Sequence, residues 1–565
     1  MNYCEQSNKY IENVLSGKIS ACKWVKLACE RQKQDLKKGV KGFVFDQEKA
    51  ERVCNFVYDI PHIKGRVSGQ LVPLSDWWVF IYTTIFGWVN DKGHRRFRTA
   101  YISVGRKNSK STGVAPIMLY LAFMDNEQGA EVYSAATTKD QAGICYRTAR
   151  SMVQKCKSFK ESLSIDIAGG NIEKSSAGSI YQTSSGSTIQ ALSRDQGGNL
   201  DGLDISGAIV DELHAHKTRD VWDVIETATG ARTQSLVLAI TTAGFNLSGI
   251  CYEQESYVKK ILDKTHDDDS YFGIIFTLDE EDLKDKERLF ADESLWKKAN
   301  PNYGLSVNKD DIKRKALKAS KLSSAQANFL TKHLNVWVNA KDAWLNMLYW
   351  QSCKKQLDLF DFRGCESYAA IDLASKSDIA VISLIVKKDG LFYLFCYSFI
   401  NEEEAEYNNN SQYYGWVQDG HLIETEGNVT DYHAIEDYIR EIAETVELKE
   451  VIFDPWQSSM ISQRLMTDGM NVVDYRQTVQ NLSEPMKELE AMIKSKKIFH
   501  DGNPCTTWQF SNVVCHTDAK ENIFPRKEQP QNKIDAAVAT IMAIGRATIE
   551  DDSGSIDDFI SSPIL

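Results

Sequence analysis

Short apolar runs alternate with amphipathic stretches through the first half of the chain. Residues 138–156 place apolar side chains at a helical period, and residues 1–60 read as helices in which charged and apolar residues interleave. The apolar runs that read as strands are at 98–104, 131–136, 206–212 and 235–244. This alternation predicts a mostly parallel sheet covered by helices.

The pattern restarts near residues 340–365. Residues 367–400 read as three strands, and "KKDG" (387–390) is a good hairpin turn between the last two. The polar stretch at 401–412 is predicted to be a loop. A helix at about 431–447, an apolar strand at 449–454 and a final helix at 532–547 follow. We therefore expect a second domain, built on a mixed sheet.

Length and composition agree with more than one domain. The chain has 565 residues, 42% hydrophobic and 25% charged, which is globular in composition and too long for one ordinary core. The predicted parts are a helical segment at 1–60, a first α/β domain at 61–345, a linker at 346–364, a second domain at 365–549 and an acidic, mobile tail at 550–565.

Several function classes are disfavoured by the same data. No apolar run is long enough to span a bilayer, and the N-terminus lacks a secretion signal, so we expect a cytosolic protein without a membrane partner. Twelve scattered cysteines without a C-x-x-C pair favour free thiols over a zinc site. The net charge of −12 argues against a passive DNA coat, whereas a DNA enzyme needs only local basic clusters such as "HRRFR" (94–98).

The stretch "GRKNSKST" (105–112) resembles a phosphate-binding loop with altered glycines, because Ser109 stands where G-x-x-x-x-G-K-[ST] has its second glycine. It lies between a predicted strand and a predicted helix, as a phosphate cradle requires. Lys110 would reach the β- and γ-phosphates, and the hydroxyl of Ser111, or of Thr112, would hold Mg²⁺. Ser109 fits this loop only if its backbone needs no positive φ.

Two further strand ends support the prediction of a nucleotide-binding site. The stretch at 205–214 reads as an apolar strand that ends in Asp211, which can hold Mg²⁺, and Glu212, which can orient and deprotonate the attacking water. The run at 238–244 ends in Thr241-Thr242, and Thr242 can sense the γ-phosphate. Each element alone could be an ordinary polar loop. Three elements in this order predict an ATPase.

Two additional nucleotide contacts are proposed from position. Arg106, four residues before Lys110, could stabilise charge on the transferring phosphoryl group, although a solvent-facing arginine is an equal alternative. Gln70 and Trp77 could form an adenine pocket, although aromatic residues before a first strand more often belong to the core.

Three aspartates in apolar surroundings predict a second site. Asp372 lies on an apolar strand, Asp454 ends another, and Asp535 lies near the start of the last helix. Acids on two strands and a helix are what a ribonuclease-H-like nuclease needs to hold two Mg²⁺ or Mn²⁺ ions. Each alone could be a cap or a salt-bridge partner, and Asp535 could simply favour a helix N-terminus. Asp378 is the reserve ligand.

Together these motifs resemble the large terminase subunit of tailed bacteriophages, over about residues 40–550. The matching stretches are "GRKNSKST", "GLDISGAIVDELHAH", "AITTAG", "KHLNVWV", "IDLASKSD", "YGWVQDGHLIETEGNVTDYHAIEDYI", "FDPW" and "KIDAAVA". Family loops often read R-K-N-G-K-[ST], so Ser109 is a departure. Trp78 stands where many members carry an adenine-motif glutamine.

The resemblance implies an N-terminal P-loop ATPase domain and a C-terminal ribonuclease-H-like nuclease domain. The first would pump double-stranded viral DNA through the portal protein into the procapsid, and the second would cut the concatemer. It also implies a small terminase subunit as partner, a ring of large subunits on the portal, a free protein that can be a monomer, and a place in the host bacterial cytoplasm with transient docking on the procapsid.

Three alternatives stay open at this point. An ATP-driven helicase or translocase with a structural carboxylate domain would lack metal-dependent DNA cleavage. A repair or resolution nuclease with an inactive nucleotide fold would lack DNA-stimulated ATP hydrolysis. A non-enzymatic scaffold would lack both activities.

Overall fold

The protein is described here from a computed structural model. It describes residues 2–63, 67–136, 139–168, 178–193, 202–216, 218–247, 249–338, 344–373, 379–407, 410, 412–455, 459–518, 521–527 and 532–549. The chain forms two compact units, Met1–Val338 and Asn339–Leu565. Asp378 and the predicted tail at 550–565 lie outside the described residues.

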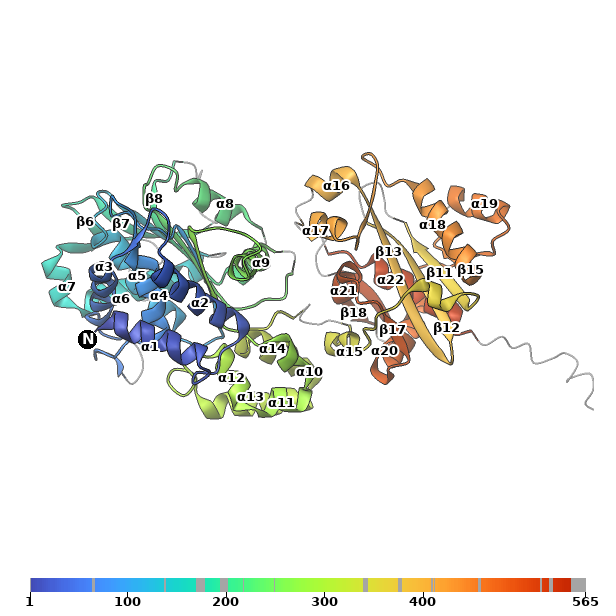
Figure 1. Ribbon diagram of the computed structural model, residues 1–565, viewed down its shortest axis with the longest axis horizontal. Helices are drawn as coiled ribbons and strands as arrows, with labels where there is room; N and C mark the ends of the chain where they lie inside the picture. The colour runs from blue at the N-terminus through green and yellow to red at the C-terminus, as the bar shows by residue number, and fades with distance from the viewer. Residues whose placement is uncertain are drawn as a thin grey trace, which may run out of the picture. The chain divides into compact units, whose positions relative to one another are not determined.

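The described residues of the first unit form an eight-stranded sheet (Figure 1). Its strands, in order across the sheet, are β10 (Tyr271–Ile275), β3 (Thr99–Ser103), β9 (Leu236–Thr241), β8 (Ile205–Asp211), β4 (Glu131–Ala136), β7 (Ser187–Ser193), β6 (Ser179–Gln182) and β5 (Ile165–Ala168). Strands β10 to β7 pair in parallel, and β6 and β5 are antiparallel. The predicted, mostly parallel sheet is therefore confirmed.

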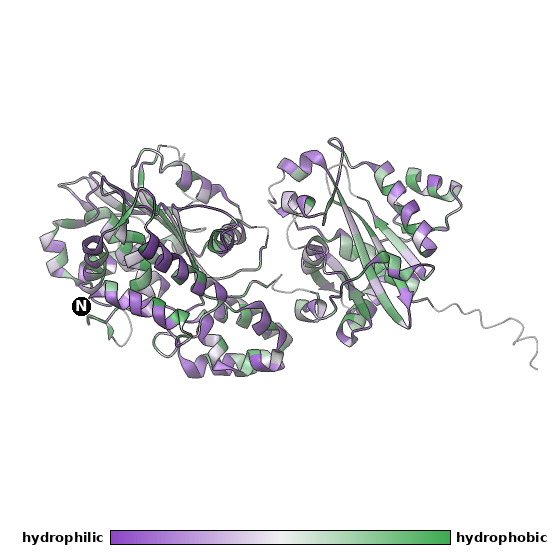
Figure 2. Ribbon diagram, viewed as in Figure 1, coloured by the Kyte–Doolittle hydropathy of each residue, from purple (hydrophilic) through white to green (hydrophobic). Residues whose placement is uncertain are grey.

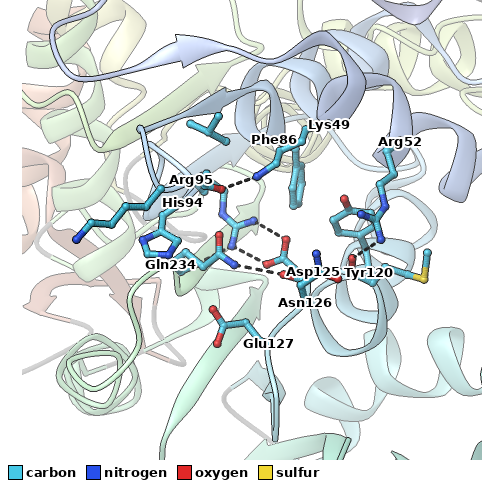
Figure 3. A pocket seen from close by; sticks show the side chains of 14 residues that line it. Lys49, Arg52, Phe86, His94, Arg95, Tyr120, Asp125, Asn126, Glu127 and Gln234 are labelled. Carbon is cyan, nitrogen blue, oxygen red and sulfur yellow. Dashed lines mark hydrogen bonds and ion pairs between the residues drawn. The ribbon is translucent and has the colours of Figure 1, made fainter.

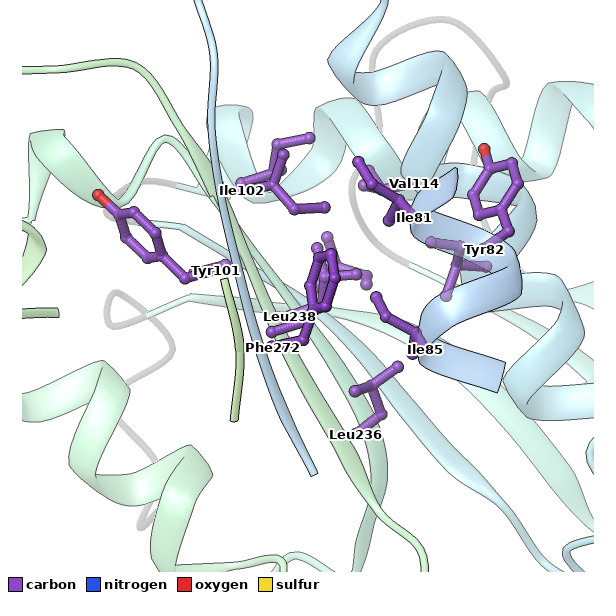
Figure 4. Close-up of a cluster of buried hydrophobic side chains, with 14 of the residues drawn as sticks. Ile81, Tyr82, Ile85, Tyr101, Ile102, Val114, Leu236, Leu238 and Phe272 are labelled. Atoms are coloured by element: carbon purple, nitrogen blue, oxygen red, sulfur yellow. The ribbon is translucent and has the colours of Figure 1, made fainter. Parts of the chain in front are cut away.

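Helices cover both faces of this sheet. They are α1 (Tyr3–Leu15), α2 (Lys23–Lys38), α3 (Gln47–Tyr58), α4 (Asp76–Gly87), α5 (Lys110–Phe123), α6 (Lys139–Lys155), α7 (Lys157–Ser162), α8 (Asp220–Thr227) and α9 (Ile250–Leu262), with a two-stranded ribbon of β1 (Val44–Phe45) and β2 (Trp88–Val89). Ile102 of β3 faces Ile81 of α4 and Val114 of α5 (Figure 4). Its neighbour Tyr101 points to the other face, where its hydroxyl meets Glu255 of α9.

A helical segment, residues 278–338, completes the first unit. It contains α10 (Glu280–Lys284), α11 (Lys286–Ala291), α12 (Glu293–Ala299), α13 (Lys309–Lys321) and α14 (Ser323–His333). Its apolar side chains form a small core of their own, which includes Leu289, Trp296 and Leu334. This second core explains why the segment folds as a distinct layer within the unit.

The described residues of the second unit form a seven-stranded mixed sheet. Its main path runs β14 (Ile423–Thr425), β13 (Leu391–Asn401), β12 (Ala380–Lys388), β11 (Glu366–Asp372), β15 (Glu447–Phe453) and β16 (Val472–Asp474), and β17 (Ile498–His500) pairs with β13. Strands β11, β12 and β13 are antiparallel, whereas β15 and β16 run parallel to β11. A two-stranded ribbon, β18 (Val513–Thr517) and β19 (Ile523–Lys527), stands apart.

Helices cover both faces of the mixed sheet as well. They are α15 (Met347–Gln351), α16 (Glu402–Tyr407), α17 (Gln412–Gln418), α18 (Tyr432–Thr445), α19 (Ser459–Thr467), α20 (Val479–Ser495), α21 (Pro504–Ser511) and α22 (Asp535–Ala547). Helices α18 and α19 share a core with Ile371 and Ile382 on one face, and α22 packs on β11 and β12 on the other. Hydrophobic residues are frequent along the strands of both sheets, and many of the helices carry hydrophilic residues (Figure 2).

Two predictions about the second half differ from the structure. The stretch 401–412 is partly helical, because the Asn401 side chain accepts from the Glu404 amide and three glutamates occupy the first turn of α16. Part of the predicted linker at 346–364 is packed structure: Trp350 is buried and stacks on His500 and Phe510. The predicted domain bounds otherwise stay a proposal.

Two general predictions can also be compared. Each of the twelve cysteines, all within the described ranges, is a free thiol, as predicted, and nine are buried. In the part of the chain that the structure describes, no helix is both long and apolar enough to cross a membrane.

Candidate active sites

The phosphate loop lies between β3 and α5, at the carboxyl end of the parallel strands. Lys110 is the first residue of α5 and is 9% exposed. Its Nζ lies 3.3 Å from Oε1 of Glu212, which directly follows β8. In the sheet, only β9 separates β3 from β8. The fold therefore brings Lys110 and Glu212 together, although they are 102 positions apart in the chain.

The backbone of this loop is strained. Ser109 has φ 58° and Lys107 has φ 71°, both in the left-handed region that favours glycine. The sequence left open whether Ser109 needs a positive φ, and the structure shows that it has one. Glu212 is left-handed too, with φ 51°. Strain of this kind costs about 1–2 kcal/mol for each residue, and it persists where surrounding contacts hold the backbone in place.

The two carboxyl groups after β8 have opposite ionisation preferences. Burial, and then the neighbouring Glu212 charge, raise the pKa of Asp211 to about 6. Burial opposes ionisation of Glu212 as well, but Lys110, His214 and Arg106 outweigh it and lower the pKa of Glu212 to about 2. Asp211 accepts a hydrogen bond from the Cys145 thiol at 3.3 Å, and that thiol also meets the Ser111 hydroxyl. The two predicted Mg²⁺ ligands, Ser111 and Asp211, therefore lie around one buried thiol.

The end of β9 joins the same cluster. Oγ1 of Thr242 donates to Glu212 Oε2 at 3.5 Å and lies 3.4 Å from Nδ1 of His214. Thr241 accepts from the His214 amide at 3.0 Å, and both threonines are fully buried. His214 Nδ1 also lies 3.2 Å from Glu212 Oε2. Glu212 is thus held between the phosphate loop and the loop after β9.

The other predicted nucleotide contacts are placed less closely. Arg106 is exposed at the loop, near enough to contribute to the low pKa of Glu212. Thr112 follows Ser111 in the first turn of α5 and is half-buried. Gln70 is exposed on a turn whose backbone pairs with His62, and the described contacts do not join its side chain to the loop. Trp77 is 2% exposed in the core, where its Nε1 donates to Asn302.

A pocket of about 280 Å³ lies at the opposite end of this sheet, before the first residues of β3, β4 and β9 (Figure 3). Arg95 and Asp125 line it as a two-pronged ion pair, with N–O distances of 3.2 and 3.0 Å. Lys49 and Arg52 of α3 line another side and donate to backbone carbonyls of Gly93 and Met124. The pocket contains none of the predicted site residues.

Two of the predicted nuclease aspartates end neighbouring parallel strands. Asp372 is the last residue of β11, and Asp454 directly follows β15, whose Phe453 pairs with Ile371. Gln477 bridges them: its Nε2 donates to Asp372 Oδ1 at 3.1 Å and its backbone amide to Asp454 Oδ2 at 3.4 Å. Both carboxylates are half-buried.

Asp535 begins α22, which covers the same face of the sheet. Ser383, the register partner of Ala370, contacts Thr540 of α22 at 2.8 Å, so Ala370 and Asp372 face this helix by alternation. Ser398 lies in the row of Asp372 and accepts from Gln509, whose side chain accepts from the first-turn amide of Ala536. The N-terminus of α22 therefore lies over the strand end that carries Asp372.

The three aspartates share one face and one end of the sheet. In the part of the chain that the structure describes, no three His, Cys, Asp or Glu side chains are gathered closely enough to hold a metal as they stand. The segment 374–378, which contains Asp378, is outside that part.

Sequence reasoning missed His214, Cys145 and Gln477. His214 stands two residues after Glu212 in "DELHAH", which was a usable signal. Cys145 and Gln477 reach their partners across 66 and 105 positions, and no spacing rule reveals such contacts.

Comparison with known proteins identifies the two domains that contain these sites. The chain matches the family models "Terminase large subunit, ATPase domain" at residues 76–260 and "Terminase large subunit, endonuclease domain" at residues 265–551. The second match begins before the helical segment, which the structure places in the first unit.

Two relatives and one solved structure illustrate the similarity. Protein YmfN of Escherichia coli (strain K12) is 35% identical over 377 residues, covering 64% of this chain and 82% of that protein. The terminase large subunit of Enterobacteria phage HK97 is 25% identical over 476 residues, covering 82% of this chain and 90% of that protein. The crystal structure of the HK97 bacteriophage large terminase has a TM-score of 0.45 and 23% identity, covering 88% of this chain and 99% of that chain.

Both units have an α/β fold. The two matched domains show that the chain is an ATPase and a nuclease of a DNA-packaging motor. Domains of these two kinds generally use Mg²⁺. The chain belongs to the family of terminase large subunits.

Proposed function

We propose that ATP hydrolysis takes place between the phosphate loop and the ends of β8 and β9. The observation that carries this proposal is the close pair of the buried Lys110 and the half-buried Glu212, at 3.3 Å. Lys110 would hold the phosphates by charge, and the phosphates would compete with Glu212 for its ammonium group. Glu212, released from Lys110 as a carboxylate, would then orient the attacking water and accept its proton.

Other residues around the loop would bind Mg²⁺, stabilise the transferring phosphoryl group and detect its loss. Ser111, with Thr112 as the alternative, and Asp211 supply the oxygen ligands that Mg²⁺ prefers, and when bound the ion would neutralise phosphate charge. Arg106 would stabilise the transferring group, and Thr242 would detect its loss through Glu212. Gln70 stays the proposed adenine contact.

Point variants test this assignment. Lys110→Ala should abolish ATP turnover and weaken ATP binding, whereas Glu212→Ala should bind ATP without hydrolysing it. Both should keep nuclease activity. Lys37→Ala, an exposed lysine at the end of α2, is the matched control and should behave like the wild type. Wild-type turnover in either site variant would show that the site is assigned wrongly.

For the nuclease, we propose that Asp372, Asp454 and Asp535 hold two Mg²⁺ or Mn²⁺ ions. All three supply carboxylate oxygens from one face and one end of the sheet, which suits hard divalent cations. When bound, the pair of ions would activate water and stabilise the leaving oxygen. Gln477 would orient Asp372 and Asp454 by its two donated hydrogen bonds. Asp378 stays the reserve ligand.

Ala and Asn substitutions of these three aspartates should each abolish cleavage of plasmid DNA and leave ATP hydrolysis intact, since Asn keeps the size but loses the charge. Asp378→Ala should have a smaller effect. Asp437→Ala on α18, on the other face of the sheet, is the control and should cut normally. A metal-soaked crystal in which the ions bind Asp378 but not Asp535 would overturn the assignment of the third ligand.

We further propose double-stranded viral DNA, a small terminase subunit and the portal protein of the procapsid as partners, with a ring of this chain on the portal in the host bacterial cytoplasm. The family supports DNA and packaging partners in general. In a packaging assay, nuclease-protected DNA should require this chain, ATP and procapsids that carry the portal. Protection without procapsids would contradict the proposal.

A further inference from the structure

The helical segment 278–338 grips the phosphate loop through buried amide groups. Asn108, in the middle of the loop, is fully buried. Its Nδ2 donates to Gly105 O at 3.0 Å and to Asn300 Oδ1 at 2.9 Å, while its Oδ1 accepts from the Asn302 amide at 3.0 Å. The loop is thus attached to the end of α12 by both polar atoms of one side chain.

Asn300 fixes this attachment. It is 1% exposed, and its Nδ2 donates to Trp296 O at 2.9 Å and to His333 O at 2.7 Å. All its hydrogen-bonding groups are therefore used within the helical segment and the loop. A β-carbon on Gly105 would lie 2.9 Å from Asn300 Oδ1, so the phosphate loop and the end of α12 are in close contact.

Additional hydrogen bonds hold the loop backbone directly. The Arg106 amide donates to Lys332 O at 2.8 Å, and the Ser306 hydroxyl donates to Lys107 O at 2.6 Å. Lys107 and Ser109 are the two strained residues of the loop, and they flank Asn108. The helical segment therefore contacts the loop at, and directly beside, the residues with a strained backbone.

A second asparagine attaches the same segment to the strand ends. Asn335 is 2% exposed and follows α14. Its Nδ2 donates to Ser103 Oγ at 2.9 Å and to Phe276 O at 2.8 Å, and its Oδ1 accepts from the Ala243 amide at 2.6 Å. One side chain thus joins the ends of β3, β10 and β9, and Ala243 directly follows Thr242.

We propose that Asn300 and Asn335 are positioning residues of the ATPase, through which the helical segment sets the geometry of the phosphate loop and of the loop after β9. This inference rests on the ATP site proposed above and deepens it. Asn300 holds Asn108 and, with it, the left-handed backbone at Ser109 that precedes Lys110. Asn335 holds the loop that carries Thr242, so nucleotide-dependent changes at Glu212 and movements of the helical segment are coupled through one side chain.

The central test is a rescue experiment in the full-length protein. Asn300→Ala should lower kcat for ATP about tenfold or more, since small displacements of a positioned group have effects of this size, and should leave plasmid cleavage unchanged. Glycine adopts positive φ without penalty. Ser109→Gly added to Asn300→Ala should therefore restore part of the lost turnover. A double variant as inactive as Asn300→Ala would overturn the role of Asn300 in holding the loop.

Control variants separate positioning from loss of stability. Asn308→Ala removes the N-cap of α13, in the same segment, and the described contacts of Asn308 do not reach the loop. It should lower the melting temperature but keep kcat and KM, and an ATPase loss as large as that of Asn300→Ala would overturn the proposal. Ser306 is exposed, so Ser306→Ala folds safely and should still lower kcat a few-fold. Wild-type kcat in Ser306→Ala together with wild-type kcat in Asn300→Ala would overturn it too.

The second asparagine and the reference variant complete the design. Asn335→Ala should lower kcat more than it changes KM, because the loop after β9 senses rather than binds nucleotide, and an unchanged kcat would remove Asn335 from the proposal. Lys110→Ala serves as the inactive reference. If Lys110→Ala kept its turnover, the ATP site itself would be wrong. If Lys110→Ala were inactive and Asn300→Ala normal, only the positioning role would fail.

Discussion

At the residue scale, the first site separates two adjacent carboxyl groups by their surroundings. Asp211 ends β8 against a buried thiol, and its pKa rises to about 6. Glu212 turns out of the strand with a left-handed backbone toward Lys110, and its pKa falls to about 2. Pairs of titratable groups pushed apart in this way often mark different chemical roles. The two side chains meet different partners: Asp211 meets the Cys145 thiol and Glu212 meets Lys110.

His333 gives a pH-dependent prediction at the same scale. Burial, and then the charge of Lys315, lower the pKa of His333 to about 4. Between pH 6.5 and 4, this histidine binds a proton in the unfolded chain but not in the folded chain. Its contribution to the free energy of unfolding is therefore fully present above pH 6.5 and is lost as the pH falls to 4. After allowance for partial exposure, the loss is about 2 kcal/mol.

His333→Gln removes this titration. The full chain is heated at pH values from 7.5 to 4.5. The melting temperature of the first unit should decrease less with falling pH in the variant than in the wild type. His216, whose pKa is also lowered to about 4, titrates in both proteins, so the difference isolates His333. Parallel decreases would contradict the prediction.

Residue type and local position were enough to predict where Lys110, Asp211, Glu212 and Asp372 lie in the fold, because each stands at the end of an apolar strand or in a loop with a known chemical pattern. They were not enough to predict Asn300, whose partner Asn108 is 192 positions away. The backbone of Ser109 also escaped prediction, since a serine at that position does not by itself indicate a positive φ.

At the element scale, strongly apolar runs gave the right strands. The predicted runs correspond to β3, β4, β8 and β9, and the three strands at 367–400 correspond to β11, β12 and β13. The strand β10 was not predicted, because an apolar run of five residues fits a buried helix equally well. Helix α16 was missed because its polar composition hid a cap and a favourable first turn.

The hairpin between β12 and β13 offers a prediction about an element. Lys388 pairs with Leu391, and the two residues between them, Asp389 and Gly390, have φ 53° and 72°. This is a two-residue turn of the kind that needs positive φ at both positions. Gly390→Ala should therefore destabilise the second unit by about 1–2 kcal/mol, seen as a lower melting temperature.

The matched control for this turn is Gly415→Ala. Gly415 lies inside α17, has open space around its Cα and no positive φ. Alanine there should stabilise the unit by up to about 1 kcal/mol. If both variants changed stability in the same direction, backbone conformation would not be the reason.

At the scale of the whole molecule, the described residues form two main cores that do not share residues. One contains Ile240 of β9 and the other Ile382 of β12. The predicted ATPase and nuclease sites lie in separate units, each at the ends of its own sheet strands. The two-domain organisation was predictable from length and from the restart of the apolar pattern. The place of the helical segment was not, because its contacts with the phosphate loop depend on folded geometry.

Separate cores predict separate unfolding. Ile240 and Ile382 are both fully buried, and truncating such a residue to alanine costs about 2–5 kcal/mol. Ile240→Ala should therefore lower only the transition that also responds to ATP, and Ile382→Ala only the other, when the full chain is heated in a calorimeter. Ligand binding shifts only the unit that binds, so ATP identifies which transition belongs to the first unit. If either variant lowered both transitions equally, the two units would unfold as one, and the independence of ATPase and nuclease variants argued above would lose its structural basis.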